Sequence, residues 1–228
     1  MSHDLRRVDV VSVINPPHGS PLVDRVPWGA SAPDRPLYGL DIETDTSVDG
    51  LDPAVSQVVA GAVTTATTDH VFLGDEVTIL SQVDELLSEL EPGFLVTWNG
   101  SGFDLPFLHE RARITDVTMG LHLWRDRLRS VEDHAFRGRW HDHDHLDGYR
   151  IYRADVGRSL GLPCGLKPMA RLVGLTPLEV DRNRMHLLDA DTLRSYVASD
   201  ARLARELVRR RGPAATRSAD GCHHLTTG

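Results

Sequence analysis

The hydrophobic pattern of the chain changes its period near residue 78. Before that point, apolar residues come in short blocks separated by turn residues: LYGLDIE, QVVAGAVTTAT and HVFLG, at 37–43, 57–67 and 70–74. Blocks of this length and composition predict a meander of three strands. From 78 to 93, apolar residues recur instead at helical spacing, and Pro92-Gly93 ends the run. This second pattern predicts an amphipathic helix.

The rest of the chain continues with alternating strands and helices. A short apolar strand is expected at FLVTWN (94–99), followed by a helix within GFDLPFLHERARI (102–114). Such alternation requires a parallel crossover, so we expect an α/β fold with a mixed central sheet flanked by helices. The remaining predicted elements are a helix at 124–136, some strand within 141–152, a short helix ending at Gly174, and a long helix from Asp189 or Asp191 to just before Gly212.

The prolines, the cysteines and the absence of a long apolar run indicate where the folded domain lies and in which compartment the protein is expected. Six prolines fall within residues 1–36, which we interpret as an irregular leader, followed by one folded domain at 37–212 and a tail at 213–228. The only cysteines, Cys164 and Cys222, are far apart, so neither a disulfide nor a cysteine metal site is expected. No run is long enough to span a membrane, which favours a cytoplasmic protein.

The formal net charge of −8 argues against a protein that coats itself with nucleic acid, but it allows a local basic groove. Lys167 is the only lysine, and all other cationic side chains apart from histidine are arginines. Arg111, Arg113 and Arg171 are candidates for a phosphate track, with a solvated helix face as the alternative.

Two carboxylates lie where the first strand ends. In a strand, residues i and i+2 point to the same side, so Asp41 and Glu43 project together. Their repulsion requires either water or a cation, and hard divalent ions such as Mg²⁺ prefer oxygen ligands of this kind. An acidic turn at a strand end is the alternative interpretation.

Two further aspartates lie in suggestive positions. Asp104 follows the fourth strand and is either a helix cap or part of a site at the edge of the sheet, where ligands of such sheets collect. Asp200 lies one helical turn after Tyr196 on the apolar face of the last helix. A carboxylate directed toward the core needs a partner, which is either an arginine or a metal ion shared with Asp41 and Glu43.

Together these segments resemble a known family. DIE, NGSGFD and YVASD resemble, in order and in setting, the three motifs of the DEDD superfamily of 3′-5′ exonucleases. Tyr196, four residues before Asp200, matches the DEDDy branch, whereas the sister branch has a histidine where this chain has Ser195. NGSGFDLPFL is most similar to the proofreading exonuclease domain of family B DNA polymerases and related stand-alone exonucleases. The likeness extends over about residues 37–211 and implies a ribonuclease H-like fold.

The resemblance implies a two-metal mechanism. By this resemblance, two Mg²⁺ or Mn²⁺ ions about 3.5 to 4 Å apart would clamp the scissile phosphate. Asp41 would bridge both ions, Glu43 and Asp200 would complete the site of the first, and Asp104 would hold the second largely through water. The Tyr196 hydroxyl would orient the attacking water together with Glu43. The implied reaction removes nucleoside 5′-monophosphates from the 3′ end of single-stranded nucleic acid, with DNA favoured over RNA. Association with replication or repair proteins stays open.

Substrate contacts follow from the same resemblance. Thr44 and Asn99 occupy positions that touch the terminal nucleotide in similar enzymes, and Phe103 is a candidate for packing on the terminal base, with core packing as its alternative. His141, His143 and His145 would share one strand face; zinc binding there is conceivable, but we favour a hydrated loop.

Two other functions compete with the exonuclease. A non-catalytic nucleic-acid-binding or interaction module with the same fold would be expected to lack at least one of the four acids. A ribonuclease H-like endonuclease would not require the tyrosine one turn before the last acid.

Overall fold

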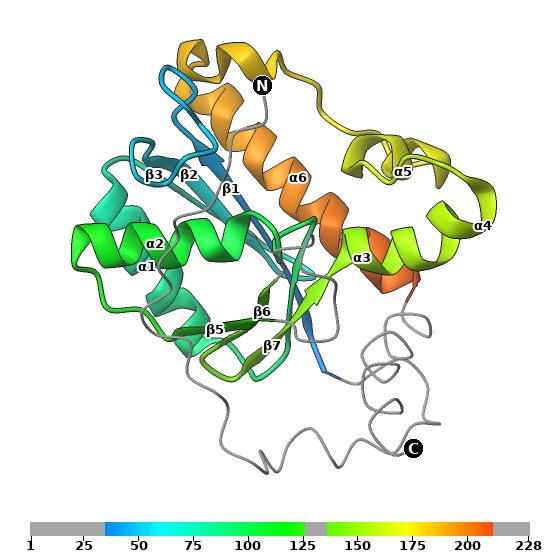
Figure 1. Cartoon of the computed structure of the whole chain (residues 1–228), viewed down its shortest axis with the longest axis horizontal. Coiled ribbons are helices and arrows are strands. Elements are labelled where there is room, and N and C mark those ends of the chain that lie inside the picture. Colours follow the sequence, from blue (N-terminus) through cyan, green and yellow to red (C-terminus); the bar gives the residue numbers. More distant parts are fainter. Residues whose placement is uncertain (1–34, 126–135, 212–228) are drawn as a thin grey trace.

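A computed structural model of the chain describes residues 35–125 and 136–211 (Figure 1). Its centre is a seven-stranded mixed sheet in the order β3-β2-β1-β4-β7-β6-β5. The strands are β1 (Leu37–Thr44), β2 (Val58–Thr64), β3 (Asp69–Leu73), β4 (Phe94–Thr97), β5 (Leu121–Arg125), β6 (Phe136–Trp140) and β7 (His143–Asp147).

Three neighbouring strands of this sheet run in the same direction. β4 pairs in parallel with β1 and with β7, whereas β2, β3, β5 and β6 each pair antiparallel with their neighbours. The carboxyl ends of β1, β4 and β7 therefore meet at one edge of the sheet, where ligands of α/β proteins usually bind.

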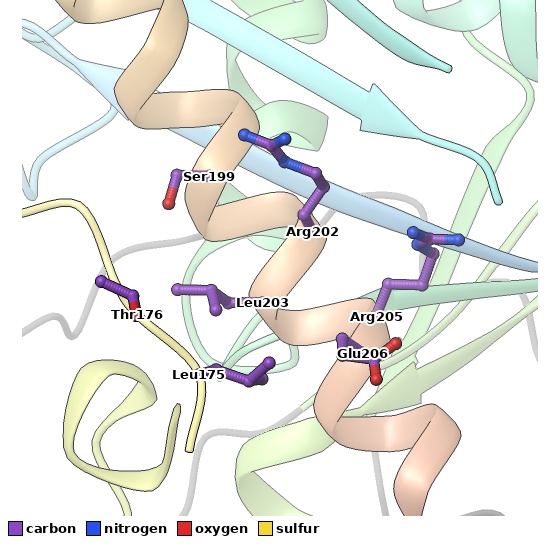
Figure 2. Close-up of a pocket in the computed structure, with 7 residues that line it drawn as sticks. All are labelled: Leu175, Thr176, Ser199, Arg202, Leu203, Arg205 and Glu206. Atoms are coloured by element: carbon purple, nitrogen blue, oxygen red, sulfur yellow. The ribbon is translucent and has the colours of Figure 1, made fainter. Parts of the chain in front are cut away.

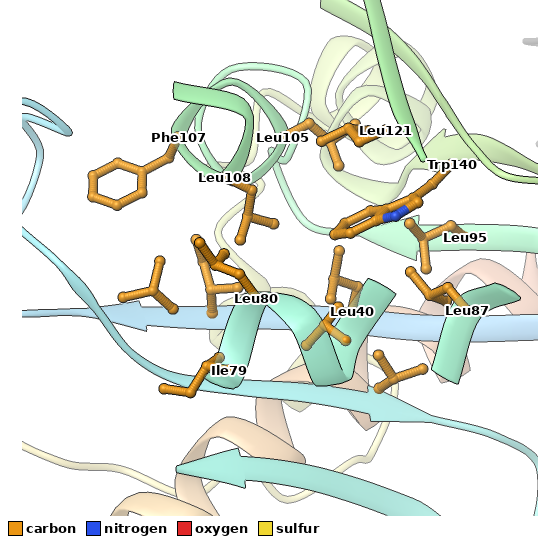
Figure 3. Packing of buried hydrophobic residues seen from close by; sticks show 14 of the residues in the cluster. Leu40, Ile79, Leu80, Leu87, Leu95, Leu105, Phe107, Leu108, Leu121 and Trp140 are labelled. Carbon is orange, nitrogen blue, oxygen red and sulfur yellow. The ribbon is translucent and has the colours of Figure 1, made fainter. Parts of the chain in front are cut away.

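Helices cover both faces of the sheet (Figure 1). The α-helices are α1 (Glu76–Glu89), α2 (Asp104–Thr115), α3 (Gly148–Tyr152), α4 (Arg158–Leu160), α5 (Leu166–Leu172) and α6 (Ala190–Arg210), with a π-helical segment η1 (Arg153–Gly157) and a 3₁₀ segment η2 (Arg182–Leu187). On one face, α1 and α2 pack over Leu40, Leu95 and Trp140 (Figure 3). On the other, α3, α5 and α6 enclose Val96.

The long helix α6 lies unusually close to β1. A Cβ atom built on Gly39 would lie 2.1 Å from the backbone oxygen of Ala201, so only glycine fits where the strand passes under the helix. α6 begins at the N-cap Asp189, whose side chain accepts a hydrogen bond from the backbone N–H of Thr192. This close contact packs the middle of α6 against β1.

The mixed sheet flanked by helices is confirmed, and so are the predicted meander, α1, β4, α2, α5 and α6. The helix predicted at 124–136 is wrong at both ends, because Trp124 and Arg125 belong to β5 and Phe136 to β6; residues 126–135 lie outside the described part. Alternation of buried and exposed residues in short antiparallel strands explains the error, since five residues are too few to distinguish the two periods. The predicted divisions at 36 and 212 also border or enter undescribed residues, 1–34 and 212–228.

The histidine-rich segment is not the hydrated loop that we favoured. Residues 143–147 form β7, a strand inside the sheet, and His143 is buried with both ring nitrogens bonded. Its Nδ1 accepts from the backbone N–H of Gly93 at 3.1 Å, and its Nε2 donates to the carbonyl oxygen of Leu87 at 2.7 Å. His141 lies outside the strand in a left-handed conformation (φ 49°), so the three histidines do not share a strand face.

Among the described residues, no helix combines the length and the apolar character needed to cross a membrane.

Candidate active site

Three of the four carboxylates singled out in the sequence come together at the end of β1. Asp41, Glu43 and Asp200 each offer an oxygen, and these oxygens all lie within 4.8 Å of one another. Asp41 and Glu43 share one side of β1, and Asp200 reaches them because α6 crosses that strand at Gly39. Asp200 is buried, whereas the two strand residues are partly exposed. A hard divalent cation fits a set of oxygen donors of this kind.

Asp104 lies beside this cluster but outside the group of three. It is the first residue of α2, it is buried, and its carboxylate accepts a hydrogen bond from the backbone of Ile42, the residue between Asp41 and Glu43. Burial, assisted by the negative charge of Asp147, raises the pKa of Asp104 to about 7. In the absence of a cation, this carboxyl therefore holds a proton far above the usual pH range of an aspartate.

Asp147, at the end of β7, is hydrogen-bonded to the loop that leads to Asp104. Its carboxylate accepts backbone N–H groups from Asn99 at 2.9 Å, Ser101 at 3.2 Å and Tyr149 at 3.1 Å. Asn99 adopts a left-handed conformation (φ 70°), which asparagine tolerates better than most residues. Because Asp147 is itself 7% exposed, these bonds form in a largely dehydrated place where an unpaired N–H would be costly.

Lys167, from α5, reaches the face of α6 that carries Tyr196 and Asp200. Its Nζ donates to the Tyr196 hydroxyl at 2.9 Å and to the carbonyl oxygen of Leu178 at 2.7 Å, and lies 3.5 Å from Asp200 Oδ2. The ammonium also lies 4.0 Å from the centre of the Tyr196 ring, a cation–π distance. Both side chains are almost fully buried. The only lysine of the chain is thus a cationic partner of the carboxylate cluster.

The candidate substrate residues lie around the same edge. Asn99 is exposed, and Phe103 is half-buried with its ring 5.3 Å from that of Phe107. Thr44 is buried, and its hydroxyl donates to the carbonyl oxygen of Gly50 at 2.6 Å, which holds the loop after β1.

The three arginines considered as a phosphate track are each bound to a carboxylate of this chain. Arg111 forms a buried ion pair with Glu76 through two hydrogen bonds. At the surface, Arg113 pairs with Glu110, and Arg171 pairs with Glu179. The Arg111 guanidinium also donates to the carbonyl oxygen of Pro53 at 2.8 Å, so it serves the fold.

Asp147 and Lys167 were missed as site residues. A signal for each was present in the sequence. Asp147 is the last residue of a strand, and Lys167 is a single lysine in a chain that otherwise uses arginine. Neither signal says which residues lie nearby, because that depends on the pairing of β7 with β4 and on the packing of α5 against α6.

The sheet order and the helices on its two faces define a ribonuclease H-like α/β fold. A family B DNA polymerase from the hyperthermophilic archaeon Pyrobaculum calidifontis shares it: the match has a TM-score of 0.62 and 24% identity, and covers 78% of this chain and 24% of that chain. This chain thus spans about a quarter of the length of the polymerase. The likeness shows the fold.

The family follows from a second comparison. Residues 54–175 match the model of predicted 3′-5′ exonucleases related to the exonuclease domain of PolB, and the chain belongs to that family. The matched segment includes Asn99, Asp104, Asp147 and Lys167, whereas β1 and α6 lie outside it. No curated protein matches the chain.

Proposed function

We propose that this protein is a divalent-metal-dependent 3′-5′ exonuclease that removes nucleoside 5′-monophosphates from the 3′ end of single-stranded nucleic acid, with DNA favoured over RNA. The observation that carries the proposal is the convergence of Asp41, Glu43 and Asp200 within 4.8 Å at the carboxyl end of β1. Family membership supports the same reaction class.

Each acidic residue has a distinct role in this proposal. Asp41, Glu43 and Asp200 would hold a Mg²⁺ or Mn²⁺ ion, and Asp104, beside Ile42, would contribute to a second ion site shared with Asp41. Bound divalent ions supply positive charge for the phosphate oxygens and make a water molecule more acidic. Asp104 must lose its proton to act as a ligand, so its raised pKa makes metal binding favour neutral over acidic pH.

Tyr196 and Lys167 position the nucleophile. Lys167 donates a hydrogen bond to the Tyr196 hydroxyl and so holds it in a set orientation on the face of α6 that carries Asp200; we assign this hydroxyl the role of orienting the attacking water. We assign Lys167 the role of fixing this orientation, and Asp147 the role of fixing the loop that bears Asn99, Phe103 and Asp104.

The test is incubation of the purified chain with 5′-labelled single-stranded DNA and RNA in Mg²⁺, Mn²⁺ or EDTA. We expect products that shorten progressively from the 3′ end, with DNA shortened faster. Asp41→Ala removes a ligand and is expected to lower the rate by about a thousandfold or more. Asp49→Ala, in the exposed turn after β1, is the matched control.

Tyr196→Phe is expected to lower kcat markedly but incompletely, by about 10- to 100-fold, because the metal ligands remain. Internal cleavage of a circular strand would instead favour an endonuclease. Strand binding without cleavage under every metal condition would favour a binding module, and activity that survives Asp41→Ala would refute the metal site.

A further inference from the structure

Besides the carboxylate edge, the outer side of α6 carries a groove that contains basic side chains (Figure 2). It encloses about 340 Å³. One wall is the segment after α5, with Leu175 and Thr176. The other is a side of α6 that carries Ser199, Arg202, Leu203, Arg205 and Glu206. In Figure 2, Arg202 and Arg205 extend from one side of α6, and Leu175 and Thr176 face the helix from the other.

Arg205 is the unusual member of this groove. Its guanidinium is partly buried, and its Nε atom is inaccessible to solvent and has no hydrogen-bond acceptor within residues 35–125 and 136–211. Burial, opposed in part by Glu206 and Asp69, lowers the pKa of Arg205. A buried donor of this kind is costly unless a ligand supplies the acceptor.

The two carboxylates near the groove already pair with arginines. Glu206 accepts hydrogen bonds from Arg209 at 2.7 and 2.8 Å and from Arg210 at 2.9 Å, which lowers its pKa to about 2. Asp69 lies 3.4 Å from Arg202. Four guanidinium groups thus stand against two carboxylates, and Arg205 is the one of the four that forms no ion pair with either of them.

The remaining polar groups of the groove also suit an anion. Ser199 accepts only a long bond, 3.4 Å, from the backbone N–H of Leu178, and its O–H is a donor. Thr176 contributes a second, exposed hydroxyl. Planar guanidinium groups together with hydroxyl donors match the oxygens of a phosphate group.

We propose that this groove binds a backbone phosphate of the nucleic-acid strand, upstream of the nucleotide being removed. The inference rests on the proposed function, because it assumes that the strand enters the site at Asp200. Ser199 adjoins Asp200 in α6, and Arg205 lies five residues further along, about 7.5 Å along the helix axis. A chain with a net charge of −8 needs such a local basic surface to hold a polyanion.

The test measures binding separately from cleavage. The full-length chain is titrated in EDTA with a 5′-labelled single-stranded 20-mer and with a dinucleotide, across a series of KCl concentrations. Each phosphate contact contributes about 0.7 to the slope of log affinity against log salt for single strands. Arg205→Gln should make the 20-mer slope shallower by about 0.7, and Arg202→Gln with Arg205→Gln by about 1.4. Dinucleotide binding should be unchanged.

Two further variants separate charge from fold. Arg205→Lys keeps the charge and should restore most of the slope. Arg113→Gln removes an exposed arginine from α2, which is not part of the groove, and should change neither the slope nor the affinity. Thermal unfolding of each variant verifies that it is folded.

An unchanged 20-mer slope in a folded double variant overturns the inference, even if the protein is an active exonuclease. Equal losses for dinucleotide and 20-mer also overturn it, because the groove would then bind the terminal or released nucleotide. Conversely, arginine-dependent strand binding by a chain that never shortens the strand supports the groove and refutes the exonuclease.

Discussion

Two clusters of charged side chains in this protein have opposite characters. Glu76 and Arg111 form one cation–anion pair whose donors and acceptors are used within the fold: Glu76 also accepts from the backbone N–H of Val58 at 2.8 Å, and Arg111 also donates to Pro53. At the edge of the sheet, by contrast, three carboxylates lie within 4.8 Å of one another, with Lys167 next to Asp200. The balanced pair stabilises the loop after β1, and the acidic cluster suits a cation from outside the chain.

The largest expected effect comes from breaking the balanced pair. Arg111→Met leaves the buried Glu76 without its cation and should lower the free energy of unfolding by about 3 to 5 kcal/mol in urea titrations. Arg113→Met, which breaks a surface pair, should cost no more than about 1 kcal/mol. Adding Glu76→Gln to Arg111→Met should recover part of the lost stability. If Arg111→Met alone cost no more stability than Arg113→Met, the buried pair would not differ from a surface pair.

Asp147 is an intermediate case, a buried carboxylate satisfied by backbone N–H groups. Asp147→Ala should lower the free energy of unfolding by about 2 to 3 kcal/mol, because the Ser101 and Asn99 N–H groups lose their acceptor. The loop with Asp104 should shift, and kcat should fall by about a hundredfold. Asp147→Asn keeps one acceptor oxygen, so it should lose less stability and less kcat than Asp147→Ala. Loss of stability without loss of kcat would limit Asp147 to a structural role.

Removing a charge from the acidic cluster should raise the free energy of unfolding, whereas breaking the balanced pair should lower it. Asp41→Asn relieves repulsion with Glu43 and Asp200 and should raise the free energy of unfolding in EDTA by about 1 kcal/mol. Mg²⁺ and Mn²⁺, which should raise the Tm of the wild type, should no longer do so in this variant. Asp49→Asn is the isosteric control, and a cation-dependent Tm that persists in Asp41→Asn would place the metal elsewhere.

The smallest effect concerns His145 of β7, whose ring is hydrogen-bonded to the hydroxyl of Thr97 in β4. Burial lowers its pKa to about 4, so from pH 6.5 down to about 4 the unfolded chain binds a proton that the folded chain does not. The free energy of unfolding should therefore fall as the pH decreases through this window. His145→Gln should remove this part of the pH dependence. Asp104, whose pKa is raised, acts in the opposite direction, so the difference between wild type and variant is the quantity to measure.

Local patterns predicted the elements and the pairing of site residues within them. Asp41 and Glu43 share a side of β1, and Tyr196 and Asp200 share a face of α6, because the strand and helix periods are properties of the backbone. The same patterns misplaced β5, β6 and the histidines, where short segments leave the period ambiguous and the sheet order decides what is buried.

What the sequence by itself determined was the identity and order of the motifs, and with them the family, because those rest on residue types and short spacings. Only the tertiary structure decided which groups meet. Lys167 reaches Tyr196 across 29 residues, and Asp147 reaches Asn99 across 48. These contacts arise from parallel strand pairing and from the close passage of α6 over Gly39, which no spacing along the chain specifies. The groove with Arg205 is likewise formed by segments that meet only in the folded chain.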